Sequence, residues 1–224
     1  MRAATVSEAV ASRRTVRAFL PKPVPLDAVE RILDKARMAP SGCNFQPWEA
    51  TVLTGAPLAA LQAEMLVAPM QTDPVEYDIQ PKAITDEYLD RLRGVGALMY
   101  GAEGIARDDA AARQAFMRRN IVSFGAPVLL LCHFPRFMGP PQWADVGMWL
   151  QTIMLLAREE GLDSCPQEFM ALYARLIKAH IRVDDATHIL FCGLGLGYRD
   201  ADTDTNRYER PRVPLERQAR FMGF

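Results

Sequence analysis

The hydrophobic pattern of the chain predicts a mixture of helices and strands. Apolar residues recur at helical spacing from Leu26, directly after a proline-rich run over Pro21–Pro25, and this helix must end before Pro40. Three further apolar segments have the length of strands, namely Trp48–Thr54, Ala126–His133 and His188–Leu196. The last two are continuous apolar runs, which predicts that both of their faces are covered and that they lie in the middle of a sheet.

Further helices are predicted over Leu58–Val67, Thr85–Glu103, Asp108–Ser123 and Trp143–Ala157, with a long proline-containing loop over residues 69–82. The last of these helices differs from the others because it is apolar on most of its circumference. Such a helix must be buried, and a monomer of this size rarely encloses one. The pattern therefore indicates a subunit interface in or near which Trp149 and Ile153 lie.

The composition is that of an ordinary globular protein. The 224 residues include 26 Lys+Arg and 27 Asp+Glu, and this near-zero net charge argues against a general nucleic-acid binder. No repeat or Ser/Gly linker divides the chain, so a single domain over 1–224 is predicted. No secretion signal or membrane-length apolar stretch is found, and the four scattered cysteines form no C-x-x-C pair. These features predict a cytoplasmic protein with reduced thiols.

A dense group of cations is the first candidate for chemistry. The five residues from Arg13 to Arg17 contain three arginines and the hydroxyl of Thr15. Arginine presents planar, permanently charged donors that fit a phosphate in a bidentate manner, and the hydroxyl adds a neutral donor. A phosphate monoester is therefore a natural ligand. The alternative is a solvated charged face with no ligand.

Three other segments carry candidate binding residues. Pro40–Trp48 combines small residues, which let the backbone approach a planar ligand closely, with the amides of Asn44 and Gln46. The alternative for this segment is a proline-bounded turn leading into a strand. Residues 206–215 form a basic arm, or else a tail that is salt-bridged to its own surface. Residues 161–168 are a candidate site, or else a helix C-cap followed by a turn.

In their order and spacing, residues 12–19, 40–48, 161–168 and 193–215 resemble the nitroreductase family of flavin enzymes, over essentially the whole chain. The sequence looks closest to the branch that reduces nitroaromatic compounds such as nitrobenzoates. The resemblance implies an α+β fold in which a central, mostly antiparallel sheet is flanked by helices. It further implies a domain-entwined homodimer with two FMN sites at the interface, and an extended C-terminal arm over 200–224 that reaches the partner subunit.

The resemblance also assigns residues to the noncovalent binding of FMN. Those that would hold the phosphate and one edge of the flavin are Arg13, Arg14, Thr15 and Arg17, with Arg210 and Arg212 completing the phosphate clamp. Those that would come from the other subunit are Pro40, Ser41, Gly42 and Asn44. Those that would lie against the flavin ring near its reactive N5, mostly through backbone groups, are Pro166, Gln167 and Glu168.

Two positions do not follow the family pattern directly. Phe169 stands where many relatives have a small residue, which affects the expected contact with N5. The polar residue that some relatives use on the ring corresponds here to either Gln142 or Asp145.

The implied reaction is the reduction of nitroaromatic compounds by NADH or NADPH. It would follow a ping-pong mechanism through N5, with protons from water and no catalytic side chain, because the cofactor carries the chemistry. Within the family, quinones, activated alkenes, halogenated phenols or flavin itself are alternative acceptors. From other classes, the alternatives are a non-catalytic module that binds anions or nucleic acid, and a structural dimerisation protein.

Two patterns are set aside. The Gly193–Gly197 run has the wrong spacing for a dinucleotide-binding loop and follows a strand instead of opening a helix. His133, His180 and His188 have no paired spacing with carboxylates or cysteines, so core or surface roles and no metal site are predicted.

Overall fold

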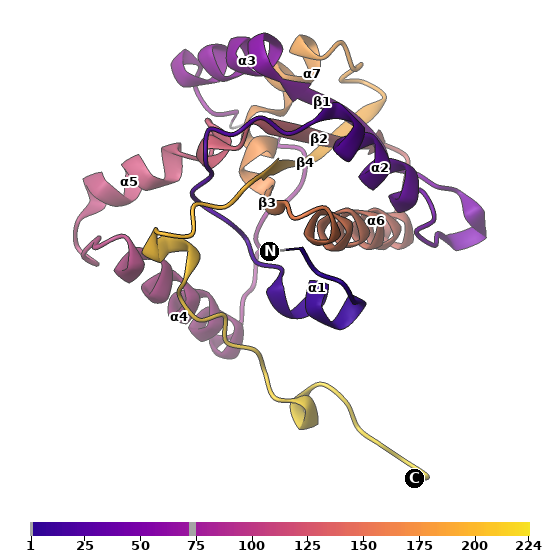
Figure 1. Ribbon diagram of the computed structural model, residues 1–224, viewed down its shortest axis with the longest axis vertical. Coiled ribbons are helices and arrows are strands. Elements are labelled where there is room, and N and C mark those ends of the chain that lie inside the picture. Colours follow the sequence, from indigo (N-terminus) through magenta and orange to yellow (C-terminus); the bar gives the residue numbers. More distant parts are fainter. Residues whose placement is uncertain (1, 72–74) are drawn as a thin grey trace.

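The computed structural model describes residues 2–71 and 75–224. In these ranges the chain forms seven α-helices and four β-strands (Figure 1). The helices are α1 (Val6–Ser12), α2 (Leu26–Ala36), α3 (Gly55–Val67), α4 (Asp86–Ala102), α5 (Ala110–Arg118), α6 (Pro140–Glu159) and α7 (Ala174–His180). The strands are β1 (Glu49–Thr54), β2 (Val128–Pro135), β3 (Asp163–Gln167) and β4 (His188–Gly197).

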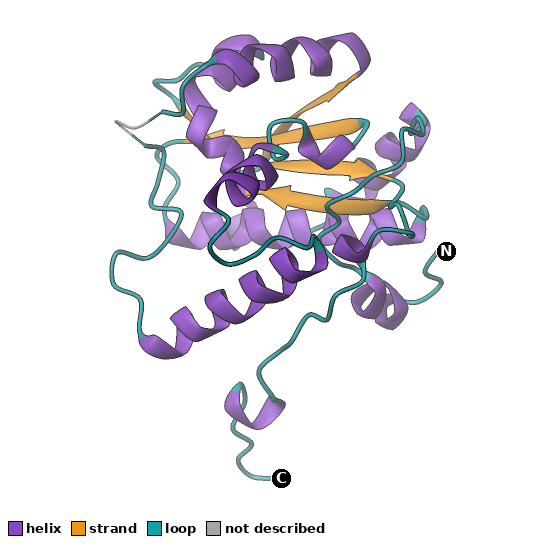
Figure 2. Ribbon diagram, turned by 90° about the vertical axis from the view of Figure 1, so that its left-hand side faces the viewer, coloured by secondary structure: helices purple, strands orange, loops and turns teal. Residues whose placement is uncertain are grey.

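The four strands form one antiparallel sheet in the order β1-β2-β4-β3 (Figure 2). The two continuous apolar runs of the sequence are the central strands β2 and β4, as predicted, and nearly all of their residues are buried. The prediction of an α+β fold with an antiparallel sheet flanked by helices is confirmed.

Helices cover both faces of the sheet. α2 and α6 pack on one face, where Ile32 and Ile153 meet Leu130, and α3 and α7 pack on the other, where Leu61 meets Leu129 (Figure 1). Successive leucines of β2 therefore point to opposite cores, as the period of a strand requires. Burial of each such side chain stabilises the fold by roughly 1.5–3 kcal/mol.

The glycine run of the sequence belongs to β4, and it does not open a helix. A Cβ atom at Gly193 would lie 2.8 Å from Met170 Cγ, and one at Gly197 would lie 2.7 Å from Pro127 Cδ. These glycines let neighbouring segments pack directly against the strand. Their role is close packing, which agrees with the rejection of a dinucleotide loop.

Within the single chain, α6 is buried on one side and exposed on the other, so the subunit interface predicted around it stays a prediction. Trp149 and Ile153 are buried in the chain's own core, in the cluster shared with α2 and the sheet. The opposite side of the helix is exposed at Ala144, Met148 and Gln151. This exposed side, which includes the apolar Met148, is the part of the helix that a partner subunit would have to cover for the prediction to hold.

Three elements, α1, β3 and α7, lie outside the segments predicted from the sequence, and α5 is shorter than predicted. α1 begins with a capping box in which Thr5 and Glu8 satisfy each other's backbone amides, a T-x-x-E signal that the pattern contained. β3 occupies the segment interpreted as a turn, and Pro166 is tolerated in it because β3 is an edge strand. α5 ends at Arg118, and the chain then turns at Ser123 and Phe124, which have positive φ angles.

Three remaining segments complete the fold. The long loop predicted over 69–82 forms no helix or strand in its described parts, and its residues 72–74 lie outside the described residues. α4 has no buried residue and exposes Leu92, Val95 and Leu98. The last residues of the chain run away from the body of the molecule (Figures 1 and 2). None of the described helices is long and apolar enough to cross a membrane.

Candidate functional site

The arginine-rich segment lies beside the edge strand β3. Thr15 forms a parallel bridge with Ser164, and the Val16 amide donates to the Ser164 carbonyl at 3.0 Å. Val16 is fully buried, whereas the side chains that flank it remain partly accessible. The backbone pairing therefore holds Arg13, Arg14 and Arg17 at the border of the sheet.

The C-terminal segment completes this region through Asn206. The Asn206 side chain accepts from the Arg17 amide at 2.9 Å and donates to the Ala18 carbonyl at 2.9 Å. The Arg14 guanidinium donates to the Asn206 and Tyr208 carbonyls, the latter at 2.8 Å. Residues almost two hundred positions apart are thus joined. Sequence reasoning found the arginines at both ends but missed Asn206, which is buried and carries no charge.

A cavity of about 120 Å³ lies between the two segments. It is lined by Arg13, Arg14, Thr15, Arg17, Val95, Thr205, Tyr208, Arg210 and Arg212, so the structure brings together all six residues predicted for the phosphate clamp. Among the described residues, no acidic side chain lines it. The guanidinium groups of these five arginines form no ion pair within the described residues.

The cations of this cavity repel one another. Burial lowers the pKa of Arg13 below its ordinary value, and the charge of Arg212 lowers it further. Burial also lowers the pKa of Arg210, and the nearby positive charges of Arg14 and Arg13 lower this pKa further. Two neighbouring arginines show the contrast, because Arg158 and Arg199 share the carboxylate of Asp163, the first at 2.9 Å. The cavity is therefore a concentration of positive charge without an internal counter-ion.

A larger cavity of about 980 Å³ adjoins the first. The two share Arg17, Val95 and Tyr208, and the hydroxyl of Tyr208 accepts from the Arg17 guanidinium at 2.8 Å. The walls of the larger cavity come from α4, α5 and the segment between them, and they include Tyr100 and Arg113, whose guanidinium lies 4.5 Å from the Tyr100 ring centroid. The arrangement joins an anion site to a broad space with aromatic, apolar and cationic walls.

The predicted segment 40–48 does not line the arginine cavity of its own chain. Its tip is exposed, and Cys43, Asn44 and Gln46 adopt positive φ angles, which cost about 1–3 kcal/mol each in a non-glycine residue. The buried carboxylate of Asp145 accepts from the Gly42 amide at 3.1 Å and anchors this tip to α6. Such strain persists only where the surroundings fix it, so the segment is held in a defined, exposed shape.

Residues 166–168 lie at the end of β3. The side chain of Gln167 is buried and donates to the Asn120 carbonyl at 2.9 Å, while Pro166 and Glu168 are exposed. Partial burial raises the pKa of Glu168 above its ordinary value. Phe169 packs into the core cluster of α3 and α7, near Tyr173, so its side chain does not block the exposed side of this turn.

Of the two mid-chain polar candidates, neither has a free side chain. Gln142 accepts from the Gly139 amide at 3.1 Å and caps the start of α6, and Asp145 anchors Gly42. Both side chains therefore already accept a hydrogen bond from a backbone amide of their own chain.

The histidines require a correction. Sequence spacing separates His133 and His188, but the antiparallel register of β1, β2 and β4 brings both beside Glu49, with their ring centroids 5.8 Å apart. His180 lies elsewhere and pairs with Glu64 at 3.0 Å. The contact between strands could not be read from spacing because it depends on which strands are neighbours.

Comparison with known proteins identifies the class. The model of the nitroreductase family matches residues 10–198, and the chain belongs to this family. The predicted family is therefore confirmed.

Individual relatives agree with this assignment. The chain is 40% identical over 217 residues to the 4-nitrobenzoate reductase of Pseudomonas putida, covering 96% of this chain and 94% of that protein. The crystal structure of the FMN- and NADPH-dependent nitroreductase NfnB from Sphigopyxis sp. strain HMH matches with a TM-score of 0.93 and 46% identity, covering 98% of this chain and all of that one. NfnB from Mycobacterium smegmatis, solved with NADPH, matches with a TM-score of 0.88 and 29% identity, covering 97% and 98%.

The residues of the arginine cavity fit the phosphate of a flavin mononucleotide. The buried hydroxyl of Thr205 lines this cavity and has no hydrogen-bond partner among the described residues. A phosphate dianion offers acceptors for this hydroxyl and for the guanidinium groups, and its charge offsets their repulsion.

Proposed function

We propose that this protein is an FMN-dependent oxidoreductase that uses NADH or NADPH to reduce nitroaromatic compounds. The observation that carries the proposal is the cavity of five arginines without an internal counter-ion, in a chain of the nitroreductase family. An enzyme that holds its cofactor by a phosphate needs such a cavity. A solvated charged face, the alternative from the sequence, does not enclose its cations around a buried hydroxyl.

The residues of this chain divide the work of binding. Arg13, Arg14, Thr15, Arg17, Arg210 and Arg212 would hold the phosphate, together with Thr205, which the sequence did not indicate. Pro166, Gln167 and Glu168 would border the ring of the flavin. Gln167 would act through its backbone, because its side chain is bound to Asn120. When bound, the flavin supplies the transfer of a hydride between NAD(P)H and the acceptor.

The acceptor would enter the larger cavity beside Tyr208. Arg93, Arg107 and Arg113 line it, and no carboxylate of residues 2–71 and 75–224 does, so its walls favour an anionic aromatic molecule. The Pseudomonas putida relative is named for a reaction with such a molecule, 4-nitrobenzoate. We therefore propose nitrobenzoates as acceptors. A flat nitro group needs no enzymic acid of matched pKa, which suits a site without a catalytic side chain.

We further propose a homodimer in which each flavin site is shared. Pro40, Ser41, Gly42 and Asn44 would come from the partner subunit, since this exposed tip is absent from the arginine cavity of its own chain. The exposed apolar residues of α4 and the C-terminal arm over 200–224 would be covered in the dimer. The chain would form one domain over 1–224. A cytoplasmic location is also proposed, in keeping with four cysteines that are all free thiols.

An anaerobic stopped-flow experiment tests the function. The purified protein should carry FMN, NADH or NADPH alone should bleach the flavin absorbance, and 4-nitrobenzoate alone should then restore it. Steady-state rates should give parallel double-reciprocal lines, because one binding space serves both substrates in turn. Protein that cannot be loaded with FMN would contradict the flavoenzyme and favour a non-catalytic anion-binding module. Bleaching without faster reoxidation by nitroaromatics would instead favour quinones, activated alkenes or halogenated phenols as acceptors.

A further inference from the structure

Glu49, His133 and His188 converge at one end of the sheet. Glu49 of β1 is the direct cross-strand partner of His133 of β2, so the two side chains lie on the same face. The register of β2 against β4 shifts between Cys132 and His133, and His188 opens β4 on the same side. A bulge of this kind often re-aims a side chain. Here it brings two imidazoles and a carboxylate together.

The distances from Glu49 to each imidazole are close to those between metal ligands. Glu49 Oε2 lies 3.5 Å from His133 Nδ1, and Glu49 Oε1 lies 3.4 Å from His188 Nε2. One donor atom from each residue lies within 4.8 Å of the others. Bonds of about 2.0–2.2 Å to a tetrahedral zinc ion place neighbouring ligands roughly 3.3–3.6 Å apart. We propose that these three residues bind one divalent transition-metal ion of the zinc type.

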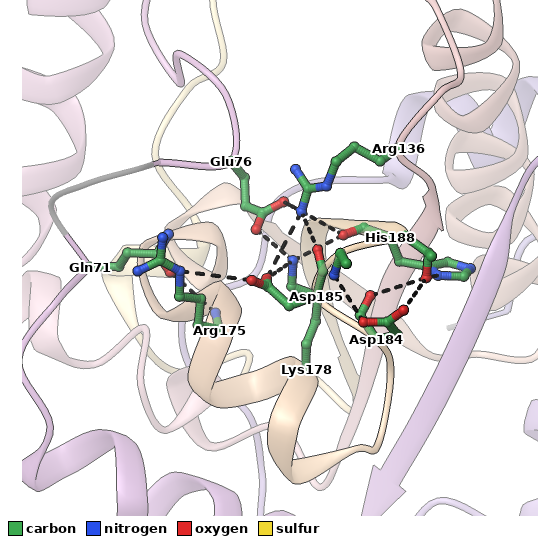
Figure 3. A network of polar contacts seen from close by, with 10 residues as sticks. Gln71, Glu76, Arg136, Arg175, Lys178, Asp184, Asp185 and His188 are labelled. Atoms are coloured by element: carbon green, nitrogen blue, oxygen red, sulfur yellow. Dashed lines mark hydrogen bonds and ion pairs between the residues drawn. The ribbon is translucent and has the colours of Figure 1, made fainter.

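The surroundings orient both histidines. The Thr187 hydroxyl lies 2.9 Å from His188 Nδ1, and the Thr51 hydroxyl lies 3.3 Å from His133 Nε2. In each ring one nitrogen is thus engaged and the other faces Glu49, the arrangement in which a second partner fixes the tautomer of a metal-binding imidazole. The carbonyl of His188 also accepts from Lys178 at 3.0 Å and from Arg136 at 2.7 Å (Figure 3). The backbone of this ligand is therefore held in place before any ion arrives.

The burial of His133 favours a bound metal ion over an ion pair between His133 and Glu49 alone. The His133 side chain is 6% exposed, and its Nδ1 atom is buried without a hydrogen bond within the described residues. An unbonded buried nitrogen is costly, and a metal ion would satisfy it. The Glu49 side chain is 50% exposed, which leaves an entry path and room for water as a further ligand.

The proposed site is distinct from the arginine cavity. β1 and β3 are the two edges of the sheet, and the segment that carries Arg13 to Arg17 bridges to β3. The three ligands belong to β1, β2 and β4. The ion would tie the edge strand β1 to the two central strands, which is a stabilising role separate from the redox reaction.

A metal titration of the FMN-loaded protein tests the site. Protein without a polyhistidine tag is freed of metals with EDTA and then titrated with Zn²⁺ and, for its visible spectrum, with Co²⁺. The wild type should bind one ion per chain and should melt at a higher temperature in the presence of Zn²⁺. Glu49→Gln and His188→Gln should each lower the affinity at least about tenfold, since changes even outside the ligand set cost 10–100-fold.

His180→Gln is the matched control. It removes an imidazole that is also paired with a glutamate but lies outside the cluster, so it should bind the ion like the wild type. The site is contradicted if the wild type takes up no ion, if both ligand variants bind like the wild type, or if His180→Gln loses the ion as well. In the first of these outcomes the three residues interact only with one another and with their protein neighbours.

Discussion

Two groups of charged side chains in this protein differ in whether the fold neutralises their charge. In the first, Lys178 is completely buried, and its ammonium group lies 2.6 Å from Glu76 and 2.6 Å from Asp185 (Figure 3). Arg136 completes this cluster by pairing with Glu76 at 3.2 Å. In the second, five arginines line one cavity, and no carboxylate from the part of the chain that the structure describes lines it with them.

The difference separates a structural role from a binding role. The Lys178 cluster joins a loop, α7 and the start of β4, and its charges are satisfied from within. In the arginine cavity, burial and then the repulsion of the neighbouring cations lower the pKa of Arg210. Charge that the fold does not neutralise marks the place where a ligand must supply the counter-charge.

Breaking the Lys178 cluster should have the largest effect on stability. Lys178→Met leaves the buried carboxylate of Glu76 with only the partly exposed Arg136 as its ionic partner, which should lower the free energy of unfolding by about 3–5 kcal/mol in urea denaturation. The control is Lys35→Met, because Lys35 pairs with Glu159 at the surface and should cost about 0–1 kcal/mol. Adding Glu76→Gln to Lys178→Met should restore part of the loss. A loss no larger than that of the control would contradict a structural role for the cluster.

Removing a cation from the arginine cavity should weaken the binding of FMN and leave the stability of the fold nearly unchanged. Arg13 makes no side-chain hydrogen bond or ion pair within the described residues, so Arg13→Gln should leave the free energy of unfolding of the FMN-free protein within about 0.5 kcal/mol of wild type. It should weaken FMN binding by about tenfold to a hundredfold in a fluorescence titration, since a charge-assisted contact contributes about 1.5–3 kcal/mol. Arg37→Gln, which removes an exposed arginine paired with Asp34, should change neither quantity. Unchanged FMN affinity in Arg13→Gln would exclude Arg13 from the clamp.

Inorganic phosphate should stabilise the FMN-free protein through the same cavity. At a concentration of 100 times its Kd, a ligand that binds only the folded state adds about 2.7 kcal/mol. The expected result is a rise in melting temperature with phosphate that is smaller in Arg13→Gln and absent with chloride at equal ionic strength. An equal rise in both proteins would show that phosphate acts on the whole surface instead of the cavity.

The smallest expected effect is on the stability of the protein at acid pH, and it depends on Asp185. The hydrogen bond from Lys178 lowers the pKa of Asp185 below its ordinary value of about 3.9. Because the folded state holds the proton less tightly, this stabilisation is present above that ordinary value and is lost as the pH falls through the lowered one. Asp185→Asn should lower stability at neutral pH by less than about 1 kcal/mol, since the side chain is half exposed, and should flatten the decline in acid. The check is the free energy of unfolding of both proteins, measured from pH 6 down to the lowest pH at which they remain folded, on the order of pH 3. The same decline in acid for Asp185→Asn and the wild type would contradict this prediction.

The sequence predicted those features that depend on neighbouring residues along the chain. The central strands were visible because continuous apolar runs require cover on both faces, and the arginines because they stand close together or in a recognisable arm. α1 was missed although its capping box, Thr5 with Glu8, is a local signal. β3 was missed because Pro166 looks incompatible with a strand unless the strand lies at an edge.

The remaining features depend on contacts between distant segments. Thr205 lines the arginine cavity only after the C-terminal segment folds back along residues 14–18, where Asn206 bonds to Arg17 and Ala18. Glu49, His133 and His188 meet only through the register of three strands. Neither the strand order nor the register is encoded in residue spacing, so no motif could reveal these groups.

The central claim is that the uncompensated arginine cavity holds the phosphate of FMN. A comparison of FMN with riboflavin, which lacks only that phosphate, tests it most directly in titrations of the flavin-free protein. The account predicts that wild type binds FMN at least about a hundredfold more tightly than riboflavin, since several charge-assisted contacts are lost together, and that Arg13→Gln narrows this ratio by affecting FMN alone. Equal affinities for the two flavins in the wild type would contradict the account.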